Sequence, residues 1–419
     1  MAATTAMAAT TRNVPSQYAT IQAAVNACAI GDRIMIANGT YNEQVTIPTS
    51  LYGLRISGGS QTACILQAGQ NQTALTIQGS DIYIEYMNIR NTYLGGSTTS
   101  HAVYVTGQHV AFDHSTIAGF QDTFQEYSTV NCYKCEIDGE VDFTYGGASS
   151  FFDTCTIKQV NASGGYNFAP NTLQTQRGYV CSNCTLTRAS GVADNSSYLM
   201  RPWGAYGETA YINCSMDSHI MPVGWSDWNG NSATCRAAEY GSKTLSSATI
   251  DLSKRASWCV RLTSAQLANY TQSVILGGWV PGPAAWVPFH NLVNRKTGLY
   301  VDGMSRANNG ADCGQYSGNG NTSQQWAIET VGNYVKLRNR STALYLDGMG
   351  RTANGSASGQ YWGDTSYNQQ YTQVSSGGYS TFQNRGTGLM VDGMSLTANG
   401  SALGQYPSNG NTSQQFTVK

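Results

Sequence analysis

The stretch HVAFDHSTIAGFQDTFQEYSTVNCYKCEIDGEVDFTYGGASSFFDTCTI, residues 109–157, repeats one short pattern. Its segments HVAFDHSTI (109–117), STVNCYKCEI (128–137) and SSFFDTCTI (149–157) alternate apolar and polar residues, and Gly, Asn or Ser separates them. Strict alternation is typical of β-strands, and no helical periodicity lies between these segments. Strands that recur at short, even intervals without intervening helices predict the stacked turns of a parallel β-helix.

Similar segments extend the pattern in both directions, from RIMIA (33–37) to TAYINCSM (209–216). Helical spacing is convincing only once, early in the chain, where apolar residues precede Gly31: Ile21, Ala24, Val25 and Cys28. A β-sandwich is the alternative, but it would favour tight hairpins with Asn-Gly or Asp-Gly turns, which are scarce in this half. The fold class that we predict is all-β.

Four cysteines recur in similar local sequences, which predicts one inward column on successive turns: Cys135, Cys155, Cys184 and Cys214. The pairs Cys132/Cys135 and Cys181/Cys184 also have the CxxC spacing of a zinc site. We favour buried thiols over a metal site, because free cysteine is among the most buried residue types.

Composition excludes several classes of protein. Only 11% of the 419 residues are charged, with 23 basic and 24 acidic side chains and no Lys/Arg cluster, so a nucleic-acid partner is not expected. No apolar run reaches the roughly 18 residues of a membrane span. The low charge and the eleven cysteines indicate a secreted, extracellular protein, although residues 1–12 read as a disordered tail without a signal peptide.

The composition of the chain changes near residue 280, where prolines become frequent. We predict a β-helix domain over residues 13–280, a proline-rich linker over 281–288 and a second domain over 289–419. In the second domain Asn-Arg, Asp-Gly-Met, Gln-Tyr and Gln-Gln-aromatic elements recur every 45 residues in three copies. Three copies with nothing left over predict a closed threefold object.

This second domain resembles the ricin-B-type β-trefoil, a carbohydrate-binding module with a repeated Gln-x-Trp element. The resemblance implies sugar contacts from each lobe, by Asp302, Tyr316 and Gln324, by Asp347, Tyr361, Asn368 and Gln369, and by Asp392, Tyr406 and Gln414. Two lobes depart from the family pattern, with Ser323 and Ser413 where Asn is expected. Alternatively, the aspartates are turn residues, and Trp326, Tyr371 and Phe416 form the trefoil core.

The β-helix domain carries two carboxylates in unusual contexts, Asp122 in GFQDTF and Asp142 in GEVDFTYGG. They are twenty residues apart, about one turn of a β-helix, so we expect them to stack on one face. Two adjacent acids do not ionise equally, so one serves as general acid and the other as base or nucleophile. Farther on, MRPW offers Arg201 to hold one carboxylate ionised and Trp203 to stack on a sugar. Either aspartate alone would read as a turn acid.

Together with GTYNE (39–43) and PVGWSDW (222–228), these segments make residues 13–280 resemble the pectin methylesterase family, a right-handed parallel β-helix. The resemblance implies a nucleophilic Asp142, Asp122 as general acid and base, Gln121 as oxyanion donor and Arg201 orienting Asp142. It also implies substrate contacts by Trp203, Tyr145 and Phe143, and neither a metal nor an organic cofactor. The implied partners are methyl-esterified homogalacturonan and, at the trefoil, plant cell-wall polysaccharide, bound by a monomer.

One position departs from that family. His101 stands where a second oxyanion glutamine is usual, and a neutral imidazole can donate one hydrogen bond in its place. Alternatively, His101 is a polar residue at a strand end. Two other functions remain open: a non-catalytic polysaccharide-binding protein, or another pectin-active β-helix such as a polygalacturonase or lyase, whose motifs are not found in the chain.

Overall fold

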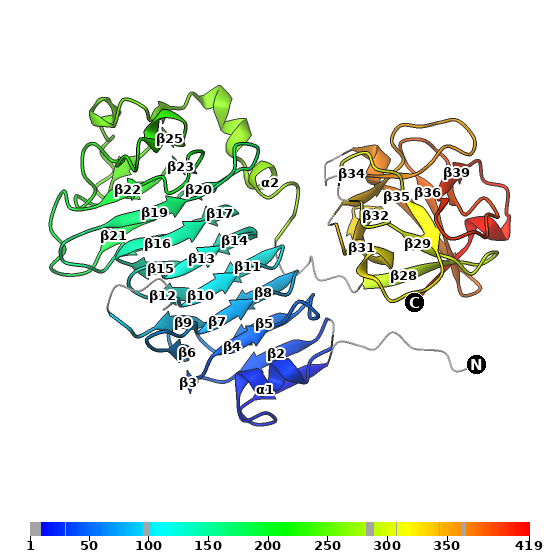
Figure 1. Ribbon diagram of the computed structural model, residues 1–419, viewed down its shortest axis with the longest axis horizontal. Helices are drawn as coiled ribbons and strands as arrows, with labels where there is room; N and C mark the ends of the chain where they lie inside the picture. Colours follow the sequence, from blue (N-terminus) through cyan, green and yellow to red (C-terminus); the bar gives the residue numbers. More distant parts are fainter. Residues whose placement is uncertain are drawn as a thin grey trace. The chain divides into compact units, whose positions relative to one another are not determined.

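The computed structural model describes residues 10–29, 31–94, 101–281, 289–306, 308–342, 344–361 and 366–419. The chain divides into two compact units, one within Ala9–Trp286 and the other within Val287–Lys419 (Figure 1). Most of the expected tail and linker, residues 1–9 and 282–288, lies outside the described residues. Each unit is built almost entirely of β-strands.

The larger unit consists of three parallel sheets. The first contains β1 (Thr11–Val14), β2 (Arg33–Ile36), β5 (Arg55–Gly58), β8 (Ile82–Glu85), β11 (Val110–Asp113), β14 (Thr129–Tyr133), β17 (Ser149–Asp153), β20 (Tyr179–Ser182), β23 (Glu208–Ile212), β25 (Arg236–Tyr240) and β27 (Val260–Arg261). The second contains β4 (Val45–Ile47), β7 (Leu75–Ile77), β10 (Val103–Val105), β13 (Phe124–Glu126), β16 (Val141–Gly146), β19 (Tyr166–Pro170) and β22 (Tyr198–Met200). The third contains β3 (Gly39–Asn42), β6 (Cys64–Ala68), β9 (Asn88–Asn91), β12 (Thr116–Ala118), β15 (Glu136–Gly139), β18 (Thr156–Gln159), β21 (Thr185–Arg188), β24 (Ser215–Met216) and β26 (Lys243–Thr244).

From β2 to β23, successive strands belong to different sheets, and each turn of the chain visits all three sheets before it returns to the first. Strand β11 is followed by β12 in the third sheet, β13 in the second and β14 back in the first, where β14 pairs in parallel with β11. This confirms the predicted parallel β-helix, and Figure 1 shows its strands stacked turn upon turn. The all-β prediction is confirmed as well.

The N-terminal end begins earlier than the sequence indicated. Thr11 and Arg12 were expected in the tail, but they belong to β1, which pairs in parallel with β2. Arg12 also forms a salt bridge of 2.7 Å with Asp32. The predicted helix is confirmed as α1 (Ile21–Asn26), although it ends before Cys28, and the Thr20 hydroxyl accepts the Ala23 N–H at its start.

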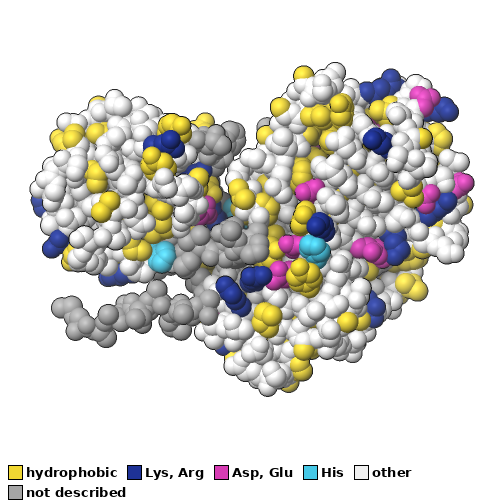
Figure 2. All heavy atoms as spheres, turned by 180° about the vertical axis from the view of Figure 1, so that it is seen from behind, with side chains coloured by type: hydrophobic (Ala, Val, Ile, Leu, Met, Phe, Trp, Pro, Cys, Tyr) yellow, Lys and Arg dark blue, Asp and Glu magenta, His cyan; other side chains and the backbone are white. Residues whose placement is uncertain are grey.

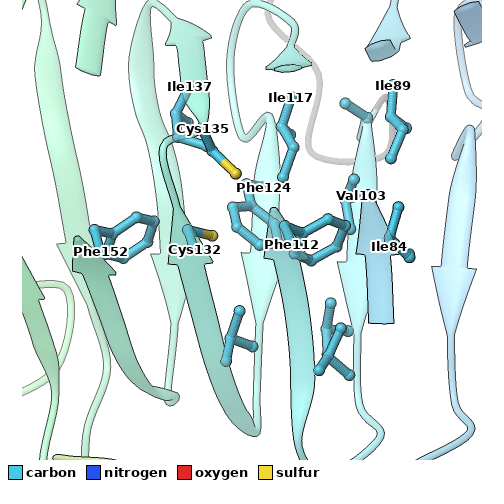
Figure 3. Packing of buried hydrophobic residues seen from close by; sticks show 14 of the residues in the cluster. Ile84, Ile89, Val103, Phe112, Ile117, Phe124, Cys132, Cys135, Ile137 and Phe152 are labelled. Carbon is cyan, nitrogen blue, oxygen red and sulfur yellow. The ribbon is translucent and has the colours of Figure 1, made fainter. Parts of the chain in front are cut away.

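Apolar residues from all three sheets fill the interior. The predicted cysteine column is confirmed, since Cys135, Cys155, Cys184 and Cys214 are buried on successive turns (Figure 3 shows the first of them beside Ile137). The Cys155 thiol donates to a backbone carbonyl oxygen of the preceding turn at 3.3 Å, and the Cys184 thiol does the same at 3.3 Å. All eleven cysteines are free thiols, and those of the column fill the space between turns as small apolar groups.

Short helices lie between and after the last strands of the larger unit: η1 (Asn231–Ala233), η2 (Leu252–Lys254), η3 (Ser264–Tyr270) and α2 (Gln272–Ile275). After α2, Leu276 and Trp279 cover apolar side chains on the outer face of the first sheet. The Trp279 ring stacks on His109, with centroids 5.0 Å apart.

Among the described residues, no helix is both long and apolar enough to cross a membrane. Figure 2 shows a surface on which most side chains are uncharged.

The smaller unit is an antiparallel assembly of three similar lobes. Its elements are β28 (Phe289–Asn294), β29 (Tyr300–Asp302), β30 (Gly314–Tyr316), η5 (Thr322–Gln324), β31 (Gln325–Val331), β32 (Tyr334–Asn339), β33 (Tyr345–Asp347), β34 (Gly359–Tyr361), η6 (Tyr367–Gln369), β35 (Tyr371–Ser376), β36 (Tyr379–Asn384), β37 (Met390–Asp392), β38 (Ser401–Ala402), β39 (Gly404–Tyr406), η7 (Thr412–Gln414) and β40 (Phe416–Val418). The first strand, β28, pairs with the last, β40, so the barrel closes on itself. Trp326, Tyr371 and Phe416 are fully buried, as expected for a trefoil core.

Candidate active site

Two connections between the third and second sheets bring Asp122 and Asp142 together. Strands β13 and β16 pair with Phe124 opposite Thr144, so Asp122 and Asp142, each two residues before that pair, occupy the same place on adjacent turns. The Asp122 N–H also donates to the Val141 carbonyl oxygen at 3.1 Å. The expected stacking of the two acids is thus what the structure shows.

Both aspartates have left-handed backbone conformations, with φ of 53° at Asp122 and 52° at Asp142. This region is unfavourable for most residues other than glycine, and such strain is concentrated at functional sites. The pairing of β16 with β19 is irregular between Val141 and Thr144, around the second aspartate. The backbone therefore departs from a regular strand where the carboxylates project.

Arg201 fixes the orientation of Asp142. It follows β22, and its guanidinium donates from Nε to Asp142 Oδ1 at 2.7 Å and from Nη2 to Oδ2. Two aromatic rings hold the guanidinium carbon, with centroids 4.3 Å away for Tyr166 and 4.2 Å away for Trp228. A two-point contact of this kind defines both the position and the charge of the carboxylate.

The two carboxyl groups have unlike environments, although both are nearly buried, at 5% exposure for Asp122 and 4% for Asp142. Burial and then the charge of Asp142 raise the pKa of Asp122 to about 7, against the opposing effects of Gln121 and Arg201. Burial also raises the pKa of Asp142, but the hydrogen bonds and charge of Arg201 oppose that rise. At neutral pH, Asp122 thus holds its proton for much of the time while Asp142 is paired with a cation.

Gln121 is half-buried, and its side chain forms a hydrogen bond with the Asp122 carboxyl. The amide is therefore at the carboxylate pair, where a donor could meet a developing negative charge. Over the part of the chain that is described, no group of three or more His, Cys, Asp or Glu side chains is arranged to hold a metal ion.

His101 lies one turn before Asp122, because β10 pairs with β13 with Val103 opposite Phe124. Its ring is buried, with Nε2 3.0 Å from the Tyr145 hydroxyl and Nδ1 3.3 Å from the Thr73 hydroxyl. Burial lowers the pKa of His101 to about 4, so the imidazole is neutral at neutral pH. Thr73 was missed from the sequence, since only the register of the turns brings it to His101.

Aromatic side chains lie beside Arg201. Trp203 is 51% exposed and stacks on Trp228, with centroids 5.7 Å apart and planes 20° apart. Trp228 was not singled out as a site residue, although its segment PVGWSDW was among the motifs that carried the resemblance. Trp203, the exposed member of this stack, is placed to cover a flat apolar ligand face.

The prediction that Phe143 contacts substrate is wrong. Its side chain is fully buried in the interior of the β-helix. It packs over Gly139 so closely that a Cβ on that glycine would lie 1.9 Å from the Phe143 Cβ. Tyr145, two residues on, is half-buried and points its hydroxyl at His101.

In the trefoil, the aspartates and glutamines of the predicted sugar sites are nearly buried. Asp302, Asp347 and Asp392 are 3% to 4% exposed, and one oxygen of each accepts the backbone N–H two residues later. The glutamines expected to bind sugar are also buried: Gln324, Gln369 and Gln414. Gln414 donates to Asp392 Oδ2 at 3.0 Å. Direct sugar contact by these six side chains stays a prediction.

The more accessible residues of that prediction are Tyr316, Tyr361 and Asn368, which are half-buried, and Tyr406, which is 39% exposed. Each tyrosine ends a Gly-Gln-Tyr strand of its lobe, directly after a buried glutamine. Sugar contact by these residues stays a prediction.

Comparison with known proteins gives a consistent picture. The family model described as pectinesterase matches residues 8–278, and that described as ricin-type beta-trefoil lectin domain-like matches residues 282–361. The putative pectinesterase 10 of Arabidopsis thaliana is 27% identical over 290 residues, covering 63% of this chain and 83% of that protein. Pectinesterase A of Dickeya dadantii (strain 3937) is 29% identical over 314 residues, covering 59% of this chain and 83% of its own.

Solved structures agree with the relatives. A pectin methylesterase from Erwinia chrysanthemi is 26% identical, with a TM-score of 0.55, and the match covers 66% of this chain and 99% of that one. A pectin methylesterase from carrot has the same fold, with a TM-score of 0.59 at 24% identity, over 66% of this chain and 95% of that one. These matches, with the family model over most of the β-helix unit, show that this chain belongs to the pectinesterase family, with a ricin-type lectin-like domain in its C-terminal part.

Proposed function

We propose that the chain hydrolyses the methyl esters of galacturonate in pectin, with Asp142 as nucleophile and Asp122 as general acid and then general base. Family and fold support pectin de-esterification. The observation that carries the assignment of roles is the asymmetry of the pair. Arg201 binds Asp142 through two hydrogen bonds, whereas no guanidinium among the described residues donates to Asp122. An acid kept protonated near neutral pH beside a paired carboxylate is suited to acid catalysis.

The first half of the reaction uses each group once. The Asp142 carboxylate attacks the ester carbonyl carbon, and the carbonyl oxygen becomes an oxyanion that accepts a hydrogen bond from Gln121. Protonated Asp122 gives its proton to the methoxy oxygen as the carbon–oxygen bond breaks, and methanol leaves. An acyl-enzyme anhydride remains on Asp142.

In the second half, ionised Asp122 takes a proton from water as the water oxygen attacks the acyl carbon. The bond to Asp142 breaks, and the Asp142 carboxylate and protonated Asp122 are restored. Galacturonic acid leaves and loses its own proton to solvent. Arg201 keeps Asp142 oriented throughout, and Trp203 covers a sugar ring next to the reacting ester. A related pectin methylesterase is known in complex with a hexasaccharide, which supports an oligosaccharide-sized site.

We further propose that the trefoil holds the secreted enzyme on plant cell-wall polysaccharide. The exposed position of Tyr406, with Tyr316 and Tyr361 at equivalent places, supports stacking of sugar rings on at least one lobe. The trefoil then binds the polysaccharide, and the β-helix unit carries out the hydrolysis.

The test is methanol release from highly methylated pectin by the intact chain and by Asp142→Asn. We expect the variant to lose at least about a thousandfold in rate while it still binds pectin. Asp153→Asn is the matched control, because Asp153 is a half-buried aspartate on the first sheet, away from the pair, and it should keep full activity. A folded intact chain that binds polysaccharide but releases no methanol would instead establish a binding protein.

A further inference from the structure

A chain of hydrogen bonds links Thr73, His101 and Tyr145 beside the two aspartates. The Thr73 hydroxyl meets Nδ1 of His101 at 3.3 Å, and Nε2 meets the Tyr145 hydroxyl at 3.0 Å. The imidazole and phenol rings lie nearly parallel, with planes 23° apart and centroids 6.1 Å apart. All three side chains are at least half-buried, so water does not readily replace these contacts.

The geometry of the turns places this contact over the reacting groups. His101 precedes β10 and Tyr145 lies in β16, and β13 lies between these strands in the second sheet. Neighbouring strands are about 4.8 Å apart, so the two side chains bridge about 10 Å across the turn that carries Asp122. His101 stands opposite Asp122 in this register, so the Tyr145 hydroxyl, 3.0 Å from the His101 ring, lies beside the turn of Asp122. Burial and then the charge of Asp122 raise the pKa of the Tyr145 phenol, and the charge of Asp142 adds to this rise.

The positions of the protons on Thr73, His101 and Tyr145 decide which of these groups can donate a further hydrogen bond. The neutral imidazole carries one N–H, and the phenol carries one O–H with oxygen lone pairs to spare. If the Thr73 hydroxyl donates to Nδ1, the imidazole N–H is on Nε2 and donates to the phenol oxygen. The Tyr145 O–H then remains free to donate elsewhere. The neighbouring carboxylates favour this arrangement, because negative charge attracts the O–H and repels the oxygen lone pairs.

We propose that Tyr145 is a second oxyanion donor, whose hydroxyl, held by His101 and Thr73, hydrogen-bonds to the ester carbonyl oxygen as that oxygen becomes negative. This rests on the esterase activity proposed above. Tyr145 is then a catalytic residue and His101 a positioning residue, which moves the donor role expected for His101 onto the phenol. No proton is transferred in this step, since the phenol keeps its proton and only shares it in a hydrogen bond. Gln121 supplies the other donor.

The experiment is a double-mutant cycle on methanol release, with Tyr145→Phe, His101→Leu and the two combined. Tyr145→Phe removes a single oxygen, and we expect kcat to fall roughly 100-fold with little change in KM, as for the loss of one oxyanion donor. His101→Leu should lower kcat in the wild-type background but have little further effect on Tyr145→Phe, because His101 acts through the phenol. Tyr133→Phe, on the first sheet, is the control and should keep wild-type kinetics.

A rescue experiment covers the case in which Tyr145→Phe fails to fold. His101→Gln offers an amide N–H to the phenol and an amide oxygen to Thr73, so it should retain more activity than His101→Leu. Wild-type kcat in Tyr145→Phe, independent losses that multiply in the double variant, or equal activity of His101→Gln and His101→Leu would each overturn the proposal. If the intact enzyme itself releases no methanol, the esterase function fails instead, which is a separate result.

Discussion

Glu126 should make the stability of the β-helix fall as pH rises. Its side chain is 0% exposed, because Glu126 ends β13 on the inward face. One carboxyl oxygen accepts from the Ser150 hydroxyl at 2.5 Å, and among the described residues the other has no partner. Burial raises the pKa of Glu126 from 4.5 to about 8. The folded protein therefore keeps this carboxyl protonated at neutral pH.

The direction and the size of this pH effect on stability follow from the linkage between proton binding and folding. Between pH 4.5 and about 8 the folded state holds a proton on Glu126 that the unfolded state has lost, so the free energy of unfolding falls as pH rises. At about 1.4 kcal/mol for each pH unit, the contribution across this window is about 5 kcal/mol. Above about pH 8 the dependence on Glu126 levels off.

Glu126→Gln keeps the shape of the side chain and removes the titration. We expect urea unfolding of the variant, followed from pH 5 to pH 9, to lose less stability than the wild type by roughly 3 to 5 kcal/mol. Other titrating groups are present in both proteins, so their effects cancel in the difference. Asp194→Asn, at an exposed acid on the same unit, should show the wild-type dependence on pH. Parallel stability curves for wild type and Glu126→Gln would refute the reasoning.

Three other outcomes follow from the site. Gln121→Leu removes a hydrogen bond that lowers the pKa of Asp122, so the alkaline limb of the pH profile of kcat/KM should move to higher pH. The maximum of kcat/KM should also fall roughly 100-fold. An alkaline limb at the wild-type pH would contradict this. Arg201→Lys loses the two-point contact that opposes the raised pKa of Asp142, so the same profile should show the acidic limb at higher pH and a lower kcat. Gly146 has a φ of 124°, and a Cβ there would lie 2.0 Å from a backbone oxygen. Gly146→Ala should therefore lower the free energy of unfolding by about 3 kcal/mol or more, as measured by thermal or urea unfolding.

Much of the architecture could be predicted because it depends on local periodicity. Alternating segments at even spacing indicated a β-helix, and the structure has three parallel sheets. The recurring cysteines indicated a buried column, which the structure confirms. Asp122 and Asp142 could be paired from sequence because their spacing equals one turn, and the β13–β16 register has that same offset.

Other features depend on contacts between turns and could not be read from any local pattern. Strict alternation would turn Phe143 outward, but the left-handed backbone at Asp142 interrupts the alternation, and Phe143 and Thr144 are both buried. In the trefoil, the repeat indicated threefold symmetry, but only the closed barrel shows that the aspartates and glutamines are buried.

The sequence by itself determined which residues alternate, which elements repeat and which acids lie one turn apart, since these are set by the two-residue period of a strand and the length of a turn. Only the tertiary structure decided that His101 bridges to Tyr145 across the turn of Asp122, and that Glu126 is sealed inside. The reason is that side chains from turns far apart in sequence meet according to the register of the stacked strands and the backbone conformation at each corner. Neither is encoded in the pattern of a single segment.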